Sequence, residues 1–171
     1  YELDLTAGAK PTVLDCGGIR VGFATCFDFY FPEHFAVLGA QGIDMVLCPS
    51  YQRSESPERI RLIAQARALD SGAYLLRSSY SMGDSDAGGR SLVAAPTGTL
   101  IADAGGRPCV LTAELDPKRK FVKPASHGRK TVEHRALIES HRRAEVYRPY
   151  SDRARLVAEA PFPRICAHRG L

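Results

Sequence analysis

The sequence lacks the features that mark several classes of protein. No apolar stretch approaches the roughly 18–20 residues that a membrane-spanning helix needs, and no signal-peptide pattern is present. No run of five like charges occurs, and the net charge of +4 is mild for 171 residues. We therefore expect neither a membrane nor a nucleic-acid partner, and we interpret the basic residues within 118–130 and 142–155 as solvated surface.

The cysteines also lack the spacing of metal-binding or disulfide-rich domains. There are five of them, an odd number, and none belongs to a CxxC pair. A zinc site and a disulfide framework are both poor interpretations of this pattern. Free thiols persist in a reducing compartment, so we expect a cytoplasmic protein.

What is present is an alternation of strand and helix signals. Pro32 and Pro57 are each suited to the first turn of a helix, and Gly42 and Gly72 are suited to end those helices. Apolar strand-like runs separate the helices, and a hairpin meander follows, which indicates a layered α/β protein. We expect strands over 12–16, 19–27, 43–48, 73–78, 91–95, 100–103 and 110–114, and helices over 32–40, 57–71 and 131–144.

One segment brings a nucleophile to the end of a buried strand. The run 19–27 places Cys26 at its carboxyl end, directly before a turn into the helix that Pro32 opens. Ligand sites of α/β sheets gather at such strand ends, and the N–H groups of the turn can stabilise a thiolate or an oxyanion. The residues alone favour a packing role for this cysteine over a catalytic one.

The same segment resembles the nucleophile motif of the nitrilase superfamily of carbon–nitrogen hydrolases. In that motif Cys, Asp, Phe, Pro and Glu stand where this chain has them within Thr25–Glu33. Further motifs of the family follow in the same order. They are the strand Gly18–Gly22 before the nucleophile, then Cys48-Pro49-Ser50, Arg67-Ala68-Leu69-Asp70, Gly89-Arg90-Ser91 and Pro96-Thr97-Gly98.

The resemblance implies an α-β-β-α sandwich and hydrolysis of amides or nitriles through a covalent intermediate on Cys26, without metal or organic cofactor. The family also uses a general-base Glu and a Lys, both well before the Cys. Only 25 residues precede Cys26, so we expect this pair, and the N-terminal part of the sandwich, to lie outside the chain. Glu2 resembles the accessory Glu of the family.

The resemblance also guides expectations about the substrate. Relatives that hydrolyse carbamoyl groups have an Arg soon after the Cys, whereas aromatic residues follow Cys26 here. We therefore expect a small amide or nitrile in an aromatic pocket, with Phe27, Tyr30, Ser50 and Tyr51 as substrate-binding residues. Asp70, where the family usually has Glu, is expected to make a structural hydrogen bond. Pairing of sandwiches in the family implies a homodimer or a higher homo-oligomer.

The last residues carry a separate signal. The segment 163–170 resembles the first strand of glycerophosphodiester phosphodiesterases, including the residues Ala167-His168-Arg169-Gly170. We expect a hydrolase domain over 1–149, and a tail, a linker or the start of a second domain over 150–171. The main alternative to an amidase is a non-catalytic interaction or regulatory module that lacks the base and the Lys, and nitrile hydrolysis on the same Cys also stays open.

Overall fold

The computed structural model describes residues 8–81 and 88–149. The chain divides into two units, Tyr1–Leu137 and Ile138–Leu171. The described part of the second unit holds the end of helix α3 (His134–His141) and a helical segment over 144–149. The predicted domain boundary after residue 149 stays a prediction, and the phosphodiesterase-like segment 163–170 lies outside the described residues.

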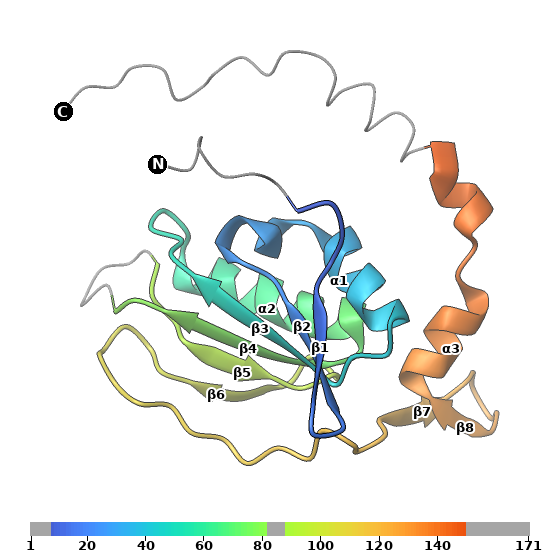
Figure 1. Ribbon diagram of the computed structural model, residues 1–171. Coiled ribbons are helices and arrows are strands. Elements are labelled where there is room, and N and C mark those ends of the chain that lie inside the picture. The colour runs from blue at the N-terminus through green and yellow to red at the C-terminus, as the bar shows by residue number, and fades with distance from the viewer. Residues whose placement is uncertain (1–7, 82–87, 150–171) are drawn as a thin grey trace. The chain divides into compact units, whose positions relative to one another are not determined.

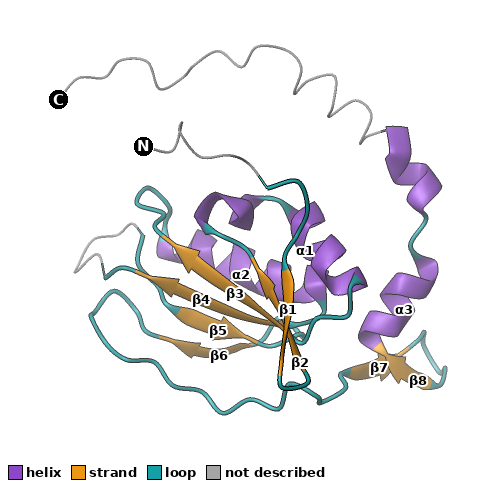
Figure 2. Ribbon diagram, in the orientation of Figure 1, coloured by secondary structure: helices purple, strands orange, loops and turns teal. Residues whose placement is uncertain are grey.

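The first unit is built on a mixed six-stranded sheet with the spatial order β1-β2-β3-β4-β5-β6. β2, β3 and β4 run parallel, whereas β1 and then β5 and β6 are added antiparallel at the two sides. The parallel strands are joined through helices α1 and α2, which lie on the same face of the sheet (Figures 1 and 2). The strands are β1 (Val13–Cys16), β2 (Ile19–Phe23), β3 (Met45–Ser50), β4 (Tyr74–Ser79), β5 (Leu92–Ala94) and β6 (Leu100–Asp103).

The turn between β1 and β2 has the conformation that its two glycines predict. Gly17 and Gly18 both have positive φ, +66° and +84°, which a two-residue hairpin turn of the mirror-image type requires. The N–H of Gly18 donates to Oδ1 of Asp15 at 2.8 Å and closes the turn. The predicted hairpin is therefore confirmed.

Both helices of this unit have the predicted bounds. α1 covers Pro32–Ala40 and α2 covers Pro57–Ser71, each with Pro in its first turn. The Ser56 side chain caps α2 by accepting from the N–H of Arg59, and Gly72 ends it in the left-handed conformation. The two helices approach so closely that a Cβ on Gly39 would lie 2.5 Å from the carbonyl oxygen of Ser71.

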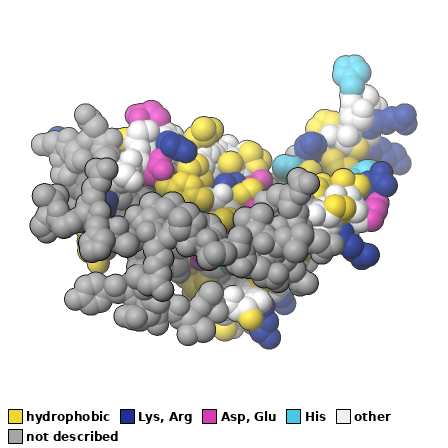
Figure 3. All heavy atoms as spheres, turned by 90° about the horizontal axis from the view of Figure 1, so that it is seen from above, with side chains coloured by type: hydrophobic (Ala, Val, Ile, Leu, Met, Phe, Trp, Pro, Cys, Tyr) yellow, Lys and Arg dark blue, Asp and Glu magenta, His cyan; other side chains and the backbone are white. Residues whose placement is uncertain are grey.

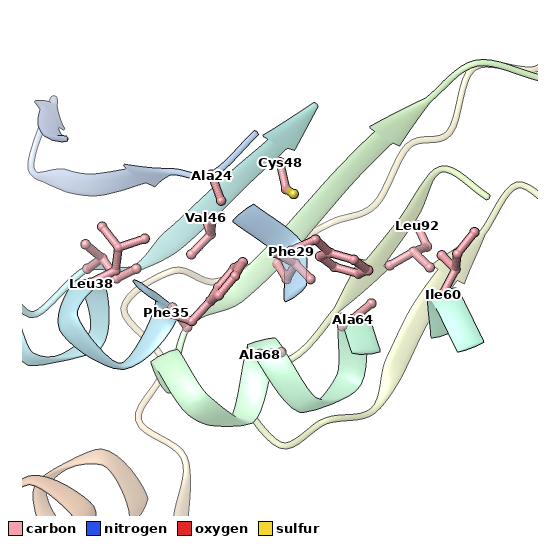
Figure 4. Close-up of a cluster of buried hydrophobic side chains, with 14 residues drawn as sticks. Ala24, Phe29, Phe35, Leu38, Val46, Cys48, Ile60, Ala64, Ala68 and Leu92 are labelled. Carbon is pink, nitrogen blue, oxygen red and sulfur yellow. The ribbon is translucent and has the colours of Figure 1, made fainter. Parts of the chain in front are cut away.

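The core lies between the sheet and the two helices. Phe29 and Phe35 are fully buried there, and their rings lie over the small side chains Ala64 and Ala68 of α2 (Figure 4). Small residues on the helix leave room for the rings at the packing density of a protein interior. Along β3 the side chains facing the helices are buried, whereas the alternate ones are partly or fully exposed. The described residues thus form one helix layer and one sheet of the predicted α-β-β-α sandwich.

Three predicted elements are wrong in extent or kind. The strand expected over 19–27 ends at Phe23, because Cys26–Tyr30 winds into a short 3₁₀ helix, η2. Residues 110–114 form no strand, and Val110 is 92% exposed. The helix expected over 131–144 begins only at His134, because Thr131–Glu133 (β8) pairs with Val122–Pro124 (β7) in a two-stranded ribbon.

The surface mixes side-chain types. Hydrophobic side chains reach it among charged ones on the face seen from above in Figure 3. Within residues 8–81 and 88–149, no helix combines the length and the apolar character that crossing a membrane demands.

Candidate active site

Cys26 lies just beyond the carboxyl end of β2, as the first residue of η2. Its φ is +45°, which places a non-glycine residue in the left-handed region. Such a conformation costs about 1–3 kcal/mol and is concentrated at functional sites, where surrounding contacts enforce it. The contacts that enforce it here come from η2 itself and from α2.

Side chains hold both ends of η2. At its start, the Asp28 carboxylate accepts from the N–H of Thr25 at 2.8 Å. At its end, the Arg67 guanidinium of α2 donates to the carbonyl oxygens of Phe29 and Tyr30, at 2.8 and 3.2 Å. Arg67 also donates to Asp70 at 2.6 Å, so the predicted structural hydrogen bond of Asp70 is confirmed. Two of the family-like motifs therefore serve to fix the turn that carries Cys26.

A backbone group from the neighbouring strand contacts the sulfur. The N–H of Tyr51, just after the end of β3, donates to Sγ of Cys26 at 3.4 Å. A donor at this position stabilises negative charge on the sulfur. The thiol is partly exposed, whereas Cys48 on β3 is 1% exposed and burial raises the pKa of its thiol.

Cys26 lines an open pocket of about 420 Å³ at the carboxyl ends of β3 and β4. Tyr51 and Tyr80 stand together on its wall with ring centroids 4.7 Å apart. The guanidinium of Arg53 lies over the Tyr51 ring, 5.2 Å from its centroid. The pocket is lined by Thr25, Cys26, Pro49, Ser50, Tyr51, Ser78, Ser79 and Tyr80, a set that contains no Asp, Glu, His, Lys or Arg.

The predicted substrate-binding residues divide into two groups. Ser50 and Tyr51 line the pocket with Cys26, although the Ser50 hydroxyl donates to the Cys48 carbonyl at 3.2 Å. Phe27 is 67% exposed and does not line this pocket; its ring contacts those of Tyr30 and Phe31. The four assignments stay predictions, and the geometry favours Ser50 and Tyr51.

Tyr30 is occupied by a contact away from the pocket. Its hydroxyl donates to Oε1 of Glu55 at 2.5 Å. Burial and the Glu55 carboxylate raise the pKa of the Tyr30 hydroxyl to about 12. The residue therefore joins η2 to the segment that leads into α2.

The predicted catalytic residue Glu2 and a histidine near Cys26, His34, are placed as follows. Glu2 lies outside the described residues. His34 is half-buried and its Nε2 donates to the Phe23 carbonyl at 2.8 Å, so this imidazole supports the end of β2. Within 8–81 and 88–149, no group of three His, Cys, Asp or Glu side chains is arranged to hold a metal ion.

Sequence reasoning missed the wall of the pocket at the carboxyl end of β4. Ser79 and Tyr80 lie there, and the Ser91 hydroxyl exchanges hydrogen bonds with the Ser79 backbone at 3.0 and 3.2 Å. The rule that places Cys26 at the end of a parallel strand applies equally to β4. That rule, applied to the Ser78-Ser79-Tyr80 run, was the available signal.

Known proteins resemble this chain in sequence and in fold. A hydrolase of Mycobacterium tuberculosis is 33% identical over 123 residues, 64% of this chain and 44% of that protein. An omega-amidase of Saccharomyces cerevisiae is 32% identical over 123 residues, 67% of this chain and 40% of that enzyme. The chain thus spans less than half the length of these relatives.

Among solved structures, an amidase from Nesterenkonia sp. AN1 superposes with a TM-score of 0.65 at 23% identity, over 85% of this chain and 51% of that one. This likeness shows the fold. A further structure of a mutant of that amidase has the acetamide moiety of fluoroacetamide bound covalently at the active-site cysteine. The model of the carbon–nitrogen hydrolase family matches residues 5–120. The chain belongs to the carbon–nitrogen hydrolases of the nitrilase superfamily, as its motifs predict.

Proposed function

We propose that the protein containing this chain hydrolyses a small-molecule amide through a thioester on Cys26. The observation that carries the proposal is the placement of Cys26. A strained cysteine, held at both ends of its turn, lines a pocket at the carboxyl ends of parallel strands and receives an N–H from Tyr51. A packing role requires neither the left-handed φ nor the opening to a pocket.

The reaction divides into two steps. The Cys26 thiolate attacks the amide carbon, and a C–S bond forms while the carbonyl oxygen gains negative charge. The C–N bond then breaks, and the nitrogen leaves as ammonia or an amine after it takes up a proton. Water attacks the thioester, and release of the carboxylic acid returns the thiol.

The start of η2 is suited to stabilise the oxyanion. The first residues of a helix have N–H groups without partners inside the helix. In η2 these residues are Cys26, which carries the sulfur, and Phe27, which follows it in the sequence. Backbone donors at the site of charge development are typical of acyl-transfer enzymes.

The described residues that line the pocket include no general base. Its described lining residues carry no carboxylate and no Lys. We propose that a general-base Glu and a Lys come from residues outside this chain and that Glu2 assists them. A protein without this pair would be the non-catalytic module considered above.

The pocket favours a small substrate with an apolar portion. Tyr51 and Tyr80 provide aromatic surface, and Ser78 and Ser79 are small. An amide is favoured over a nitrile because the yeast relative is named an omega-amidase and the Nesterenkonia enzyme an amidase. The acetamide adduct of the latter is the kind of covalent species that Cys26 would form.

The test uses the full-length protein, a panel of short aliphatic amides and the matching nitriles. Cys26→Ala should abolish turnover and the adduct seen by intact-mass spectrometry. The control, Cys109→Ala, removes an exposed thiol far along the sequence and should leave both unchanged. If Cys26→Ala turned over amides near the wild-type rate, Cys26 would not be the nucleophile. If the protein hydrolysed only the nitriles, the proposed activity would be that of a nitrilase and not of an amidase.

A further inference from the structure

A buried arginine lies in β4, the strand whose last residues line the pocket, at a position where a strand would ordinarily have an apolar residue. Arg77 is in β4, only 2% exposed, and is the Cα partner of Cys48 in β3. Its strand neighbours Tyr74 and Leu75 are buried and Leu76 is partly buried. A guanidinium stays protonated in proteins, so the interior here contains a fixed positive charge.

No carboxylate within residues 8–81 and 88–149 forms an ion pair with this charge. Nη1 donates to the carbonyl oxygens of Gly89 and Arg90, at 2.5 and 2.7 Å, and Nη2 donates to Oε1 of Gln52 at 2.9 Å. Burial lowers the pKa of Arg77. A buried charge without an opposite charge is unfavourable for stability, so packing gives no reason for Arg at this position.

The contacts of Arg77 explain its placement. Its guanidinium lies over the ring of Phe29, 5.6 Å from the centroid, and Phe29 belongs to the same 3₁₀ helix as Cys26. Gln52 directly follows Tyr51, whose N–H donates to the Cys26 sulfur. One side chain therefore contacts η2, the segment after β3 and the backbone at residues 89–90.

We propose that Arg77 is a positioning residue of the active site, which holds the Tyr51 N–H against Cys26 through Gln52. The proposal rests on the proposed role of Cys26 as nucleophile. In it, the fork of the guanidinium fixes Gln52 from one side while the carbonyl groups of Gly89 and Arg90 fix the guanidinium from the other. The positive charge also lies near enough to Cys26 and Cys48 to interact favourably with negative charge on either sulfur.

The experiment measures the rate at which iodoacetamide alkylates Cys26 in the full-length protein, with each cysteine quantified by peptide mass spectrometry. Arg77→Met keeps the length of the side chain and removes its charge and its donors. Gln52→Leu breaks only the link toward Tyr51. Each should slow alkylation of Cys26 by about tenfold, the effect of losing a charge-assisted hydrogen bond.

The double variant tests the coupling. If Arg77 acts through Gln52, Arg77→Met with Gln52→Leu should be no slower than the slower single variant. Arg77→Lys, which keeps the charge and one donor group, should recover part of the rate. Arg61→Met is the matched control, because Arg61 pairs with Asp103 at 2.6 Å and its loss should leave the rate unchanged.

A purely structural role has a different signature. Loosening of the fold would speed the alkylation of buried Cys48 and leave that of Cys26 unchanged. That outcome, or single effects that multiply in the double variant, would overturn the proposal. If Arg77→Met does not fold, Gln52→Leu and Arg77→Lys decide the question. Wild-type Cys26 that reacts no faster than exposed Cys109 would instead remove the nucleophile on which the proposed function stands.

Discussion

The left-handed backbone at Cys26 predicts that glycine is more stable there than alanine. Cys26→Ala and Cys26→Gly both remove the thiol, so their difference reports on the Cβ at φ +45°. A Cβ in this region costs about 1–2 kcal/mol. Glycine also lowers the free energy of unfolding by about 0.4–1 kcal/mol relative to alanine, because it increases the conformational entropy of the unfolded chain. The glycine variant should therefore be the more stable, by roughly 0.5–1 kcal/mol.

Urea unfolding of the full-length protein measures the difference, from midpoints compared at equal slope. The matched control is Ala36→Gly within α1, at a position without positive φ. At this position glycine should lower the free energy of unfolding by about 1 kcal/mol relative to alanine, because the residue is helical and not left-handed. A Cys26→Gly variant as stable as Cys26→Ala, or less stable, would refute the view that the fold forces Cys26 into strain.

Gly39→Ala should lower the free energy of unfolding by about 1–3 kcal/mol, because the new Cβ would meet backbone of Ser71 at 2.5 Å and force α1 from α2; an unchanged urea midpoint would contradict the close approach. Ultraviolet titration of the full-length protein should show one tyrosine ionising near pH 12 in the wild type and absent from Tyr30→Phe. Because this pKa is raised above the ordinary value of 10.0, the stabilisation that the Tyr30 hydroxyl provides should be present below pH 10 and decline as pH rises toward 12. A stability difference between wild type and Tyr30→Phe that stays constant over that range would count against the Glu55 contact. Iodoacetamide should spare Cys48, which is buried with a raised thiol pKa, until the protein is unfolded by urea; early labelling of Cys48 would show that its surroundings open readily.

Helices α1 and α2 could be predicted to the residue, because local residues determine where each of them begins and ends, whereas the bounds predicted for α3 are wrong. Pro at the first turn and glycine in or near the position after the last turn define α1 and α2 without reference to the rest of the chain. The end of β2 could not be predicted in this way. Residues 24–30 are as apolar as a buried strand, and only the carboxylate of Asp28 and the guanidinium of Arg67, 39 residues further on, determine that the chain turns into η2.

Some residues of the candidate site could likewise be predicted from the sequence, and others could not. Cys26, Ser50 and Tyr51 follow from motifs and from the rule on strand ends, and they do lie together. The role of Arg77 could not be found from sequence, because its partners Gln52, Gly89 and Arg90 lie 25, 12 and 13 residues away and two of them contribute only carbonyl groups. Residues 110–114 are a case in which the sequence predicts an element that is absent. Their apolar pattern predicts a strand, but in the described part of the chain they have no neighbouring strand to pair with.

The residues that hold Cys26 in place and the residues that form the far wall of the pocket are different sets. The bonds that hold Cys26 come from Asp28, Arg67 and the Tyr51 backbone, whereas the far wall consists of Ser79 and Tyr80. A new side chain at Tyr80 would reshape the pocket and replace the ring contact with Tyr51, without removing any hydrogen bond to the turn that carries Cys26. In the proposed function, substrate range and the reactivity of Cys26 would therefore depend largely on different residues, with Tyr51 common to both sets.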